Sequence, residues 1–133
     1  MSRILVTDAS VVVDLLARFE PESIEAALFL NGAQLAAPEL VDLEVLNTLR
    51  KLEAEGAIPR RRRASVIEDF KALRIRRYRH EALRDGVWQR RKNLSAYDAS
   101  YVVLAGLLGA TLVTRDERLA RAPRLGIEIL VPR

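Results

Sequence analysis

The stretch RILVTDASVVVDLL, residues 3–16, decides how this chain folds. Arg3–Thr7 is a short run rich in branched apolar side chains, which predicts a buried strand. Asp8 and Ser10 then stand where a helix N-cap belongs, and Val11–Arg18 continues as a helix. A buried strand that leads directly into a helix is typical of a parallel sheet with helices on both faces.

The rest of the chain repeats this alternation of strands and helices. Four further short apolar runs predict strands: Gln34–Ala37, Ile75–Tyr78, Thr111–Thr114 and Ile127–Val131. The segments between them predict helices: Glu22–Leu30, Glu39–Glu55, Pro59–Leu73, Glu81–Lys92, Ser95–Leu108 and Glu117–Ala122. No linker or internal repeat divides the chain, so we expect a single domain, residues 1–133, of the α/β class. Its expected architecture is a three-layer α/β/α sandwich with a short, mainly parallel central sheet.

Composition excludes several kinds of functional site. The chain has no cysteine and one histidine, so disulfide scaffolds, zinc–thiolate centres and thiol nucleophiles are excluded, and a Ser-His-Asp triad is disfavoured. Glycine-rich dinucleotide and P-loop phosphate motifs are absent from the sequence. Any metal ion bound by this chain must therefore be held by oxygen ligands.

Membrane insertion is also not expected. The longest uncharged stretch, Ala99–Thr114, is 16 residues, shorter than the ~20 that a spanning helix needs. Asp8 and Asp14 interrupt the apolar residues near the N-terminus, which disagrees with a signal peptide. We expect a cytoplasmic protein without membrane contact.

Charge is distributed unevenly along the chain. Residues 50–92 contain 15 Lys or Arg and 6 Asp or Glu, a net charge of +9, so the other 90 residues carry −5. A basic segment beside an acidic remainder is typical of proteins that bind a phosphate backbone, although a solvated helix surface has the same composition. Four consecutive arginines are the candidate phosphate contacts: Arg60, Arg61, Arg62 and Arg63.

Two acidic residues follow predicted strands. Asp8 comes after RILVT, and Asp116 comes after TLVTR. In open α/β sheets ligands bind beyond the carboxyl ends of the strands, close to where the strand order reverses. Both residues also precede helices, where aspartate is a favoured N-cap. The sequence leaves helix capping and a functional role open for each of them.

Two further acids lie on predicted helices. On a helical wheel Glu44 shares the side of Leu40 and Val41, which should be buried, so its carboxylate needs a cation or an arginine partner. Asp98 stands three residues after Ser95, where it could instead be the acid of a capping box.

Gathering four carboxylates at one edge of a sheet requires neutralisation. Each like-charge pair ~4 Å apart costs about 4 kcal/mol at an effective dielectric near 20. Divalent cations provide the compensating charge, and a site with only oxygen ligands favours Mg²⁺, or Mn²⁺, over zinc. The four acids together therefore predict a metal site.

Three segments carry a family resemblance: VTDASVVVDLL (6–16), APELVDLEVLNTLRKL (37–52) and SAYDASYVVLAGLLGATLVTRDERLAR (95–121). In their order and spacing they resemble the PIN-domain nucleases, specifically the VapC-type toxins of prokaryotic toxin–antitoxin pairs. The resemblance implies a PIN-like fold in which four acids form the catalytic metal site: Asp8, Glu44, Asp98 and Asp116. It further implies three supporting polar residues: Ser10, Asn47 and Thr114.

The resemblance also implies an activity and partners. The expected protein is a Mg²⁺-dependent endoribonuclease that acts as a toxin, forms a homodimer and is covered by a cognate antitoxin. RNA would bind through the basic segment that contains Arg60–Arg63. The alternative from a different class is a catalytically inactive module on the same fold that binds nucleic acid or protein.

The aromatic residues are interpreted as structural. Trp88 lies on the predicted helix Glu81–Lys92 and is interpreted as a core or interface anchor rather than a base-stacking platform. Tyr97, which precedes Asp98, is interpreted as a packing residue.

Overall fold

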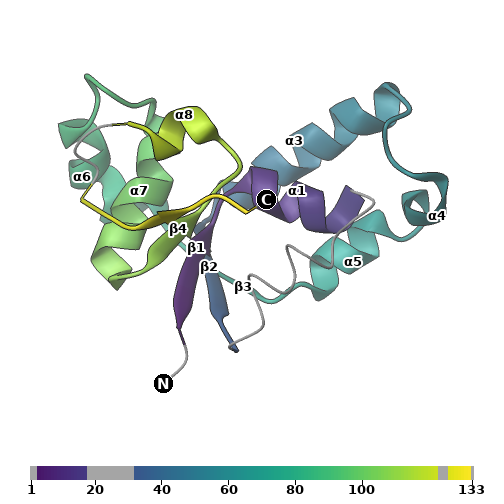
Figure 1. Cartoon of the computed structure of the whole chain (residues 1–133), viewed down its shortest axis with the longest axis horizontal. Coiled ribbons are helices and arrows are strands. Elements are labelled where there is room, and N and C mark those ends of the chain that lie inside the picture. The colour runs from purple at the N-terminus through teal and green to yellow at the C-terminus, as the bar shows by residue number, and fades with distance from the viewer. Residues whose placement is uncertain (1–2, 18–31, 123–125, 133) are drawn as a thin grey trace.

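The computed structural model describes residues 3–17, 32–122 and 126–132, and its centre is a parallel sheet (Figure 1). The sheet has five strands: β1 (Ile4–Thr7), β2 (Gln34–Pro38), β3 (Ile75–Tyr78), β4 (Thr111–Val113) and β5 (Ile129–Leu130). Their order is β3-β2-β1-β4-β5, and every neighbouring pair is parallel. All five predicted strands are present, which confirms the α/β class, and the sheet is wholly rather than mainly parallel.

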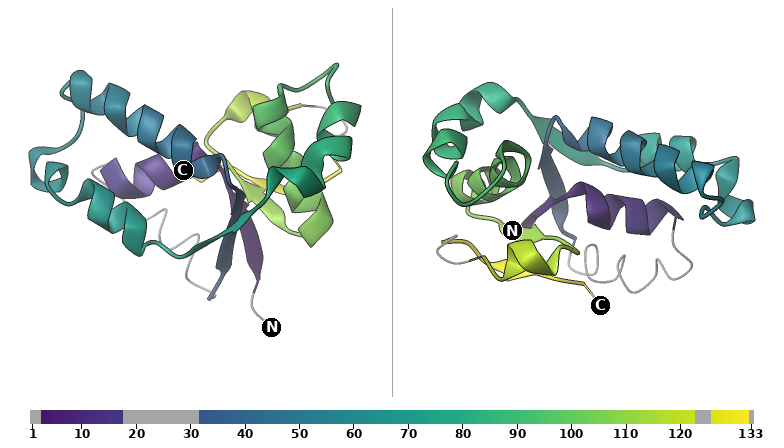
Figure 2. Two further views of the ribbon diagram at one scale, coloured as in Figure 1. Left: turned by 180° about the vertical axis from the view of Figure 1, so that it is seen from behind. Right: turned by 90° about the horizontal axis from the view of Figure 1, so that it is seen from above.

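Helices cover both faces of the sheet. They are α1 (Ala9–Ala17), α3 (Val41–Ala54), α4 (Arg60–Arg63), α5 (Val66–Ala72), the 3₁₀ turn η1 (His80–Leu83), α6 (Arg84–Gln89), α7 (Ala96–Leu108) and α8 (Glu117–Ala120). Helices α1, α3 and α5 lie on one side of the strands and α6 and α7 on the other, in the views of Figure 1 and Figure 2. This is the expected three-layer sandwich. The predicted helix Glu22–Leu30 lies outside the described residues.

The predicted basic helix Pro59–Leu73 is wrong as a single helix. It is divided at Ala64 and Ser65 into the short α4 and the separate α5. The four arginines form α4 themselves, and the Arg63 side chain reaches back so that its Nε donates to the carbonyl of Ile58, 3.0 Å away. The local hydrogen bonds of the arginines therefore favour a break that the charge pattern does not show.

The core lies between the sheet and the two helical layers. The middle of α7 is buried over Ala99–Ala105, as the apolar sequence of this helix predicts. Helix α6 approaches α7 closely at Gly86, where an added Cβ would lie 2.7 Å from Val103 Cγ1. Within the described ranges, no helix is both long and apolar enough to cross a membrane.

The strand order reverses between β1 and β4, and this marks one place along the carboxyl-terminal edge of the sheet. The chain leaves β1 for β2 and β3 on one side, and later returns to β4 on the other side of β1. The carboxyl ends of β1 and β4 thus flank the point where the strand order reverses, which is where α/β folds bind ligands. Asp8 follows β1 and Asp116 follows β4, so both lie at this edge.

Candidate active site

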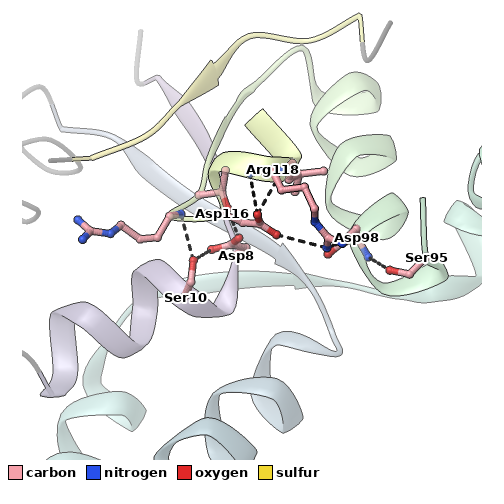
Figure 3. A network of polar contacts seen from close by, with 9 residues as sticks. Asp8, Ser10, Ser95, Asp98, Asp116 and Arg118 are labelled. Atoms are coloured by element: carbon pink, nitrogen blue, oxygen red, sulfur yellow. Dashed lines mark hydrogen bonds and ion pairs between the residues drawn. The ribbon is translucent and has the colours of Figure 1, made fainter. Parts of the chain in front are cut away.

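Four acidic residues from separate elements come together at this edge. Figure 3 shows Asp8 after β1, Asp116 at the start of α8 and Asp98 in the first turn of α7. Glu44, on α3, is close enough to the others that the charges of Asp8 and Asp98 raise its pKa. The structure therefore brings together the four acids that the sequence singled out.

Asp8 is a buried carboxylate held by three donors. Its Oδ1 accepts hydrogen bonds from Ser10 Oγ at 2.5 Å and from the Val11 amide at 3.3 Å, and Thr114 Oγ1 donates to its Oδ2. Burial raises the pKa of Asp8, the three hydrogen bonds oppose the rise, and the charge of Asp116 adds to it. Two of the predicted supporting residues, Ser10 and Thr114, are thus direct partners of Asp8.

The loop that carries Asp116 is fixed by the same hydroxyl groups. The Arg115 amide donates to Ser10 Oγ at 3.1 Å, and the Asp116 amide donates to Thr114 Oγ1 at 3.0 Å. Arg115 Nε also pairs with the buried carboxylate of Asp14 on α1, at 3.1 Å. The two strand ends are therefore tied to each other and to α1.

Asp8 and Asp116 cap helices and belong to the acidic site at the same time. Asp116 Oδ1 accepts hydrogen bonds from the amides of Arg118 and Leu119, at 3.0 and 3.2 Å, as the N-cap of α8. Asp8 bonds the Val11 amide in the same way at the start of α1. For Asp116 the two interpretations do not compete, because capping uses Oδ1 and leaves Oδ2 for another partner.

Glu44 is held by a phenol rather than by an arginine. Tyr101 Oη donates to Glu44 Oε1 at 2.6 Å. Burial raises the pKa of Glu44, the Tyr101 hydrogen bond opposes the rise, and the neighbouring acids add to it. Burial also raises the pKa of the Tyr101 phenol, which keeps its proton available for donation. Sequence reasoning missed Tyr101, although it lies three residues after Asp98 and so on the same side of α7.

Asp98 and Asp116 share one cation of the chain itself. Arg118 Nη2 lies 3.6 Å from Asp98 Oδ2 and 3.8 Å from Asp116 Oδ2. The predicted N-cap is confirmed, because Ser95 Oγ accepts a hydrogen bond from the Asp98 amide at 3.1 Å. Arg118 was not identified from the sequence. Its side chain is 82% exposed, so it can leave the two carboxylates at little cost.

Asn47 is not brought into contact with the acids. Its side chain is exposed and accepts a hydrogen bond from Arg50 Nη2 at 3.0 Å. It lies three residues after Glu44 on α3, but the helix directs it toward solvent. The structure therefore shows no contact by which this third supporting residue would act.

The arginine run lies at the opposite end of α1. Arg62 Nη1 donates to the carbonyls of Leu15 and Leu16, both at 3.2 Å. Because an α-helix rises ~1.5 Å per residue, these carbonyls lie about 11 Å along the helix from Asp8. Arg62 and Arg63 are thus engaged by backbone carbonyls, and the run is not adjacent to the acidic residues.

The oxygen ligands of the acidic residues suit a hard divalent cation, but their present positions do not form a complete metal site. Among the residues that the structure describes, no three acids lie close enough to hold one ion together. The available donors are nevertheless carboxylate oxygens, which Mg²⁺ and Mn²⁺ prefer. The Oδ2 atoms of Asp98 and Asp116 already converge on a cationic nitrogen, so a metal ion that replaces Arg118 would meet two ligands at once.

Comparisons with known proteins identify the family of this chain. The PIN domain family matches residues 5–125. Ribonuclease VapC3 of Mycobacterium tuberculosis is 37% identical over 118 residues, which cover 89% of this chain and 86% of the relative. Ribonuclease VapC1 of the same organism is 37% identical over 129 residues, covering 96% and 97%.

A solved structure shares the fold. The toxin-antitoxin complex from Klebsiella pneumoniae contains a chain that matches with a TM-score of 0.64 and 18% identity, covering 97% of this chain and 98% of that one. At this identity the likeness concerns the fold alone.

Proposed function

Because this chain belongs to the PIN domain family and is a homologue of the VapC ribonuclease toxins, we propose that its acidic residues hydrolyse phosphodiester bonds of RNA with the help of Mg²⁺ or Mn²⁺. The observation that carries the proposal is the convergence of four carboxylates from four elements at the carboxyl edge of the sheet. Such a cluster of like charges lowers the stability of the folded chain, and bound cations would offset that cost.

The residues divide the work of the site. Asp98 and Asp116 offer the Oδ2 atoms that now face Arg118 and would hold the ion, and Asp8, which Ser10 and Thr114 hold in place, adds negative charge beside them. A divalent cation held by these carboxylates would lower the pKa of a water molecule and neutralise charge on the scissile phosphate.

Glu44 suits proton acceptance. Tyr101 donates to its Oε1, which orients the carboxylate and leaves Oε2 to accept a proton from a water molecule. No side-chain nucleophile is required, in agreement with a chain that lacks cysteine.

The test is metal-dependent cleavage of a single-stranded RNA by the purified chain. We expect cleavage with Mn²⁺ or Mg²⁺, none in excess EDTA, and a loss of at least about 100-fold in Asp98→Asn. The matched control is Glu117→Gln, which removes one negative charge beside Asp116 at an exposed position and should leave cleavage unchanged. Full activity in EDTA or in Asp98→Asn would refute the proposal.

Metal binding is measured separately from activity. Titration with Mn²⁺, followed by its electron paramagnetic resonance signal, should show binding to the unaltered chain and weaker binding to Asp98→Asn. RNA binding without Mn²⁺ binding or cleavage would instead support the inactive nucleic-acid-binding module.

We also propose a cognate antitoxin and a homodimer. The antitoxin follows from the VapC relatives and from the Klebsiella pneumoniae complex, and an arginine or lysine of such a partner could take the place that Arg118 occupies between Asp98 and Asp116.

For the homodimer, Leu43 and Leu46 of α3 are 73% and 41% exposed and offer an apolar surface. Light scattering separates a dimer from the 15.0 kDa monomer. A ribonuclease with these partners would act in the cytoplasm.

A further inference from the structure

A groove between α6 and the first turn of α7 lies beside the acidic site. It consists of two adjoining cavities of about 200 and 390 Å³ that share Arg84, Val87 and Ala96 as walls. Tyr97 lines the smaller cavity and Trp88 the larger one. We call this feature the α6–α7 groove.

The aromatic residues of the groove are exposed. Trp88 is 66% and Tyr97 is 65% exposed, so neither packs in the core. The core half of the interpretation of Trp88 is wrong, and its role as an interface anchor stays a prediction. Tyr and Trp are enriched at interfaces, and apolar surface that is gathered in a groove marks an interaction site more often than a single exposed ring does. The sequence predicted a longer helix, Glu81–Lys92. Helix α6 instead ends at Gln89, so Trp88 lies in its last turn, where no other element that the structure describes covers the ring.

Cations accompany the exposed rings. The Arg91 guanidinium lies 4.4 Å from the centroid of the Trp88 ring, and Arg91 Nη1 donates to the Trp88 carbonyl at 2.9 Å, which fixes it there. Arg84 lines both cavities. No Asp or Glu lines either cavity among the described residues, so the α6–α7 groove is apolar and basic in character.

The groove adjoins the acidic residues through the start of α7. Ser95 lines the larger cavity, and its Oγ accepts the hydrogen bond of the Asp98 amide, as Figure 3 shows. Tyr97, in the smaller cavity, directly precedes Asp98. A chain bound in the groove would therefore reach the acidic site within a short distance.

We propose that the α6–α7 groove binds an unpaired base of single-stranded RNA, with the stacked pair of Trp88 and Arg91 as the platform for the base and the two arginines, Arg84 and Arg91, as the positive charge that attracts the adjoining phosphates. Aromatic rings stack on any base, and guanidinium groups both stack and pair with phosphate, so this combination fits a single-stranded nucleic acid. A basic groove without carboxylates also complements a polyanion. The inference rests on the proposed function, since it assigns a base-binding subsite to the substrate of that site.

The test uses Trp88 itself as the probe, because it is the single tryptophan of the chain. A single-stranded oligouridylate is titrated into the purified chain in EDTA, where the proposed cleavage cannot occur. An oligomer of the same length with the bases removed is titrated in parallel. We expect the oligouridylate to quench Trp88 fluorescence and the abasic oligomer to leave it unchanged.

Variants separate stacking from charge. Trp88→Ala should weaken oligouridylate binding about tenfold with little effect on the abasic oligomer, and Trp88→Phe should restore much of the loss. Leu107→Ala is the matched control, because Leu107 is 64% exposed at the other end of α7 and outside the groove. Arg84→Gln with Arg91→Gln should weaken both oligomers and flatten the salt dependence of binding.

The outcomes also distinguish this inference from the proposed function. Quenching by oligouridylate in a chain that cleaves no RNA would support the base-binding subsite and refute the catalytic proposal. Cleavage without quenching, equal quenching by the abasic oligomer, or unchanged RNA affinity in Trp88→Ala would overturn the subsite. Unchanged RNA affinity together with loss of antitoxin binding in Trp88→Ala would assign the groove to the protein partner instead.

Discussion

The two ends of α1 differ in how charge is arranged. At its start, the carboxylate of Asp8 caps the helix but lies among three other acids, and its pKa is raised by burial and by the charge of Asp116. At its end, the Arg62 guanidinium meets the carbonyls of Leu15 and Leu16, where the helix dipole is negative. Both ends therefore satisfy the helix dipole, but only at the acidic end do burial and the repulsion between neighbouring carboxylates oppose that favourable interaction.

This difference separates stability from function. An interaction that satisfies a helix end stabilises the folded chain whether or not a substrate is present. A cluster of like charges destabilises the folded chain and persists where a ligand compensates it. Substitutions at the two ends should therefore affect different measurements.

The largest effect is expected for Asp8→Asn. Cleavage of single-stranded RNA should fall by at least about 100-fold, since the substitution removes a candidate metal ligand with little change in shape. The thermal midpoint should stay the same or rise, because a buried carboxylate with a raised pKa becomes neutral. Asp69→Asn, at an exposed position of α5, is the control and should leave RNA cleavage unchanged. A collapse of the thermal midpoint in Asp8→Asn would mean that its helix cap outweighs its charge.

An intermediate effect is expected for Arg62→Ala at the other end of α1. The free energy of unfolding should fall by about 1–2 kcal/mol, because two carbonyls lose a charged donor at the helix end. RNA cleavage by the folded variant should not change. Arg60→Ala removes an exposed neighbour of the same type and should alter stability by no more than about 0.5 kcal/mol. Urea unfolding measures both variants. Equal losses of stability would show that Arg62 stabilises the chain no more than Arg60 does.

The smallest effect is expected for Glu44→Gln and depends on pH. A raised carboxyl pKa means that the folded chain binds this proton more tightly than the unfolded chain, so the unaltered protein loses stability as the pH rises through that pKa. Glu44→Gln should therefore be more stable at neutral pH, by at most about 1 kcal/mol after solvent screening. The difference should vanish in acid, where both states carry the proton.

Urea unfolding at neutral and acidic pH measures this difference. Glu53→Gln, which is exposed on the same helix, should show no comparable gain. Lower stability of Glu44→Gln at neutral pH would show that the Tyr101 hydrogen bond to the carboxylate outweighs the repulsion among the acids.

The sheet could be predicted from the sequence because short apolar runs end at clear boundaries. The arginine-containing run Ile75–Tyr78 is a strand as well, since it forms the edge of the sheet, where Arg76 and Arg77 are exposed. The break of the basic helix could not be predicted, because it depends on the particular carbonyls that Arg62 and Arg63 meet in the folded chain.

The acids could be predicted for a similar reason, and their partners could not. Asp8 and Asp116 follow strands, and this position alone brings them to one edge of a parallel sheet. Tyr101 and Arg118 reach Glu44 and Asp98 across elements whose relative rotation the sequence spacing does not determine. The exposure of Trp88 likewise depends on where α6 ends rather than on its own helical position.

The hydrogen bonds of the two hydroxyl groups between the strand ends all run in one direction, toward Asp8. A hydroxyl has one hydrogen, and Ser10 and Thr114 both give it to Asp8, so each can only accept from the backbone amide that meets it. The amides of Arg115 and Asp116 are thus the first donors of two hydrogen-bond chains that both end at the carboxylate of Asp8. Hydrogen exchange at these two amides would therefore report the breaking of their bonds to Ser10 and Thr114, and so how firmly the two strand ends are held together.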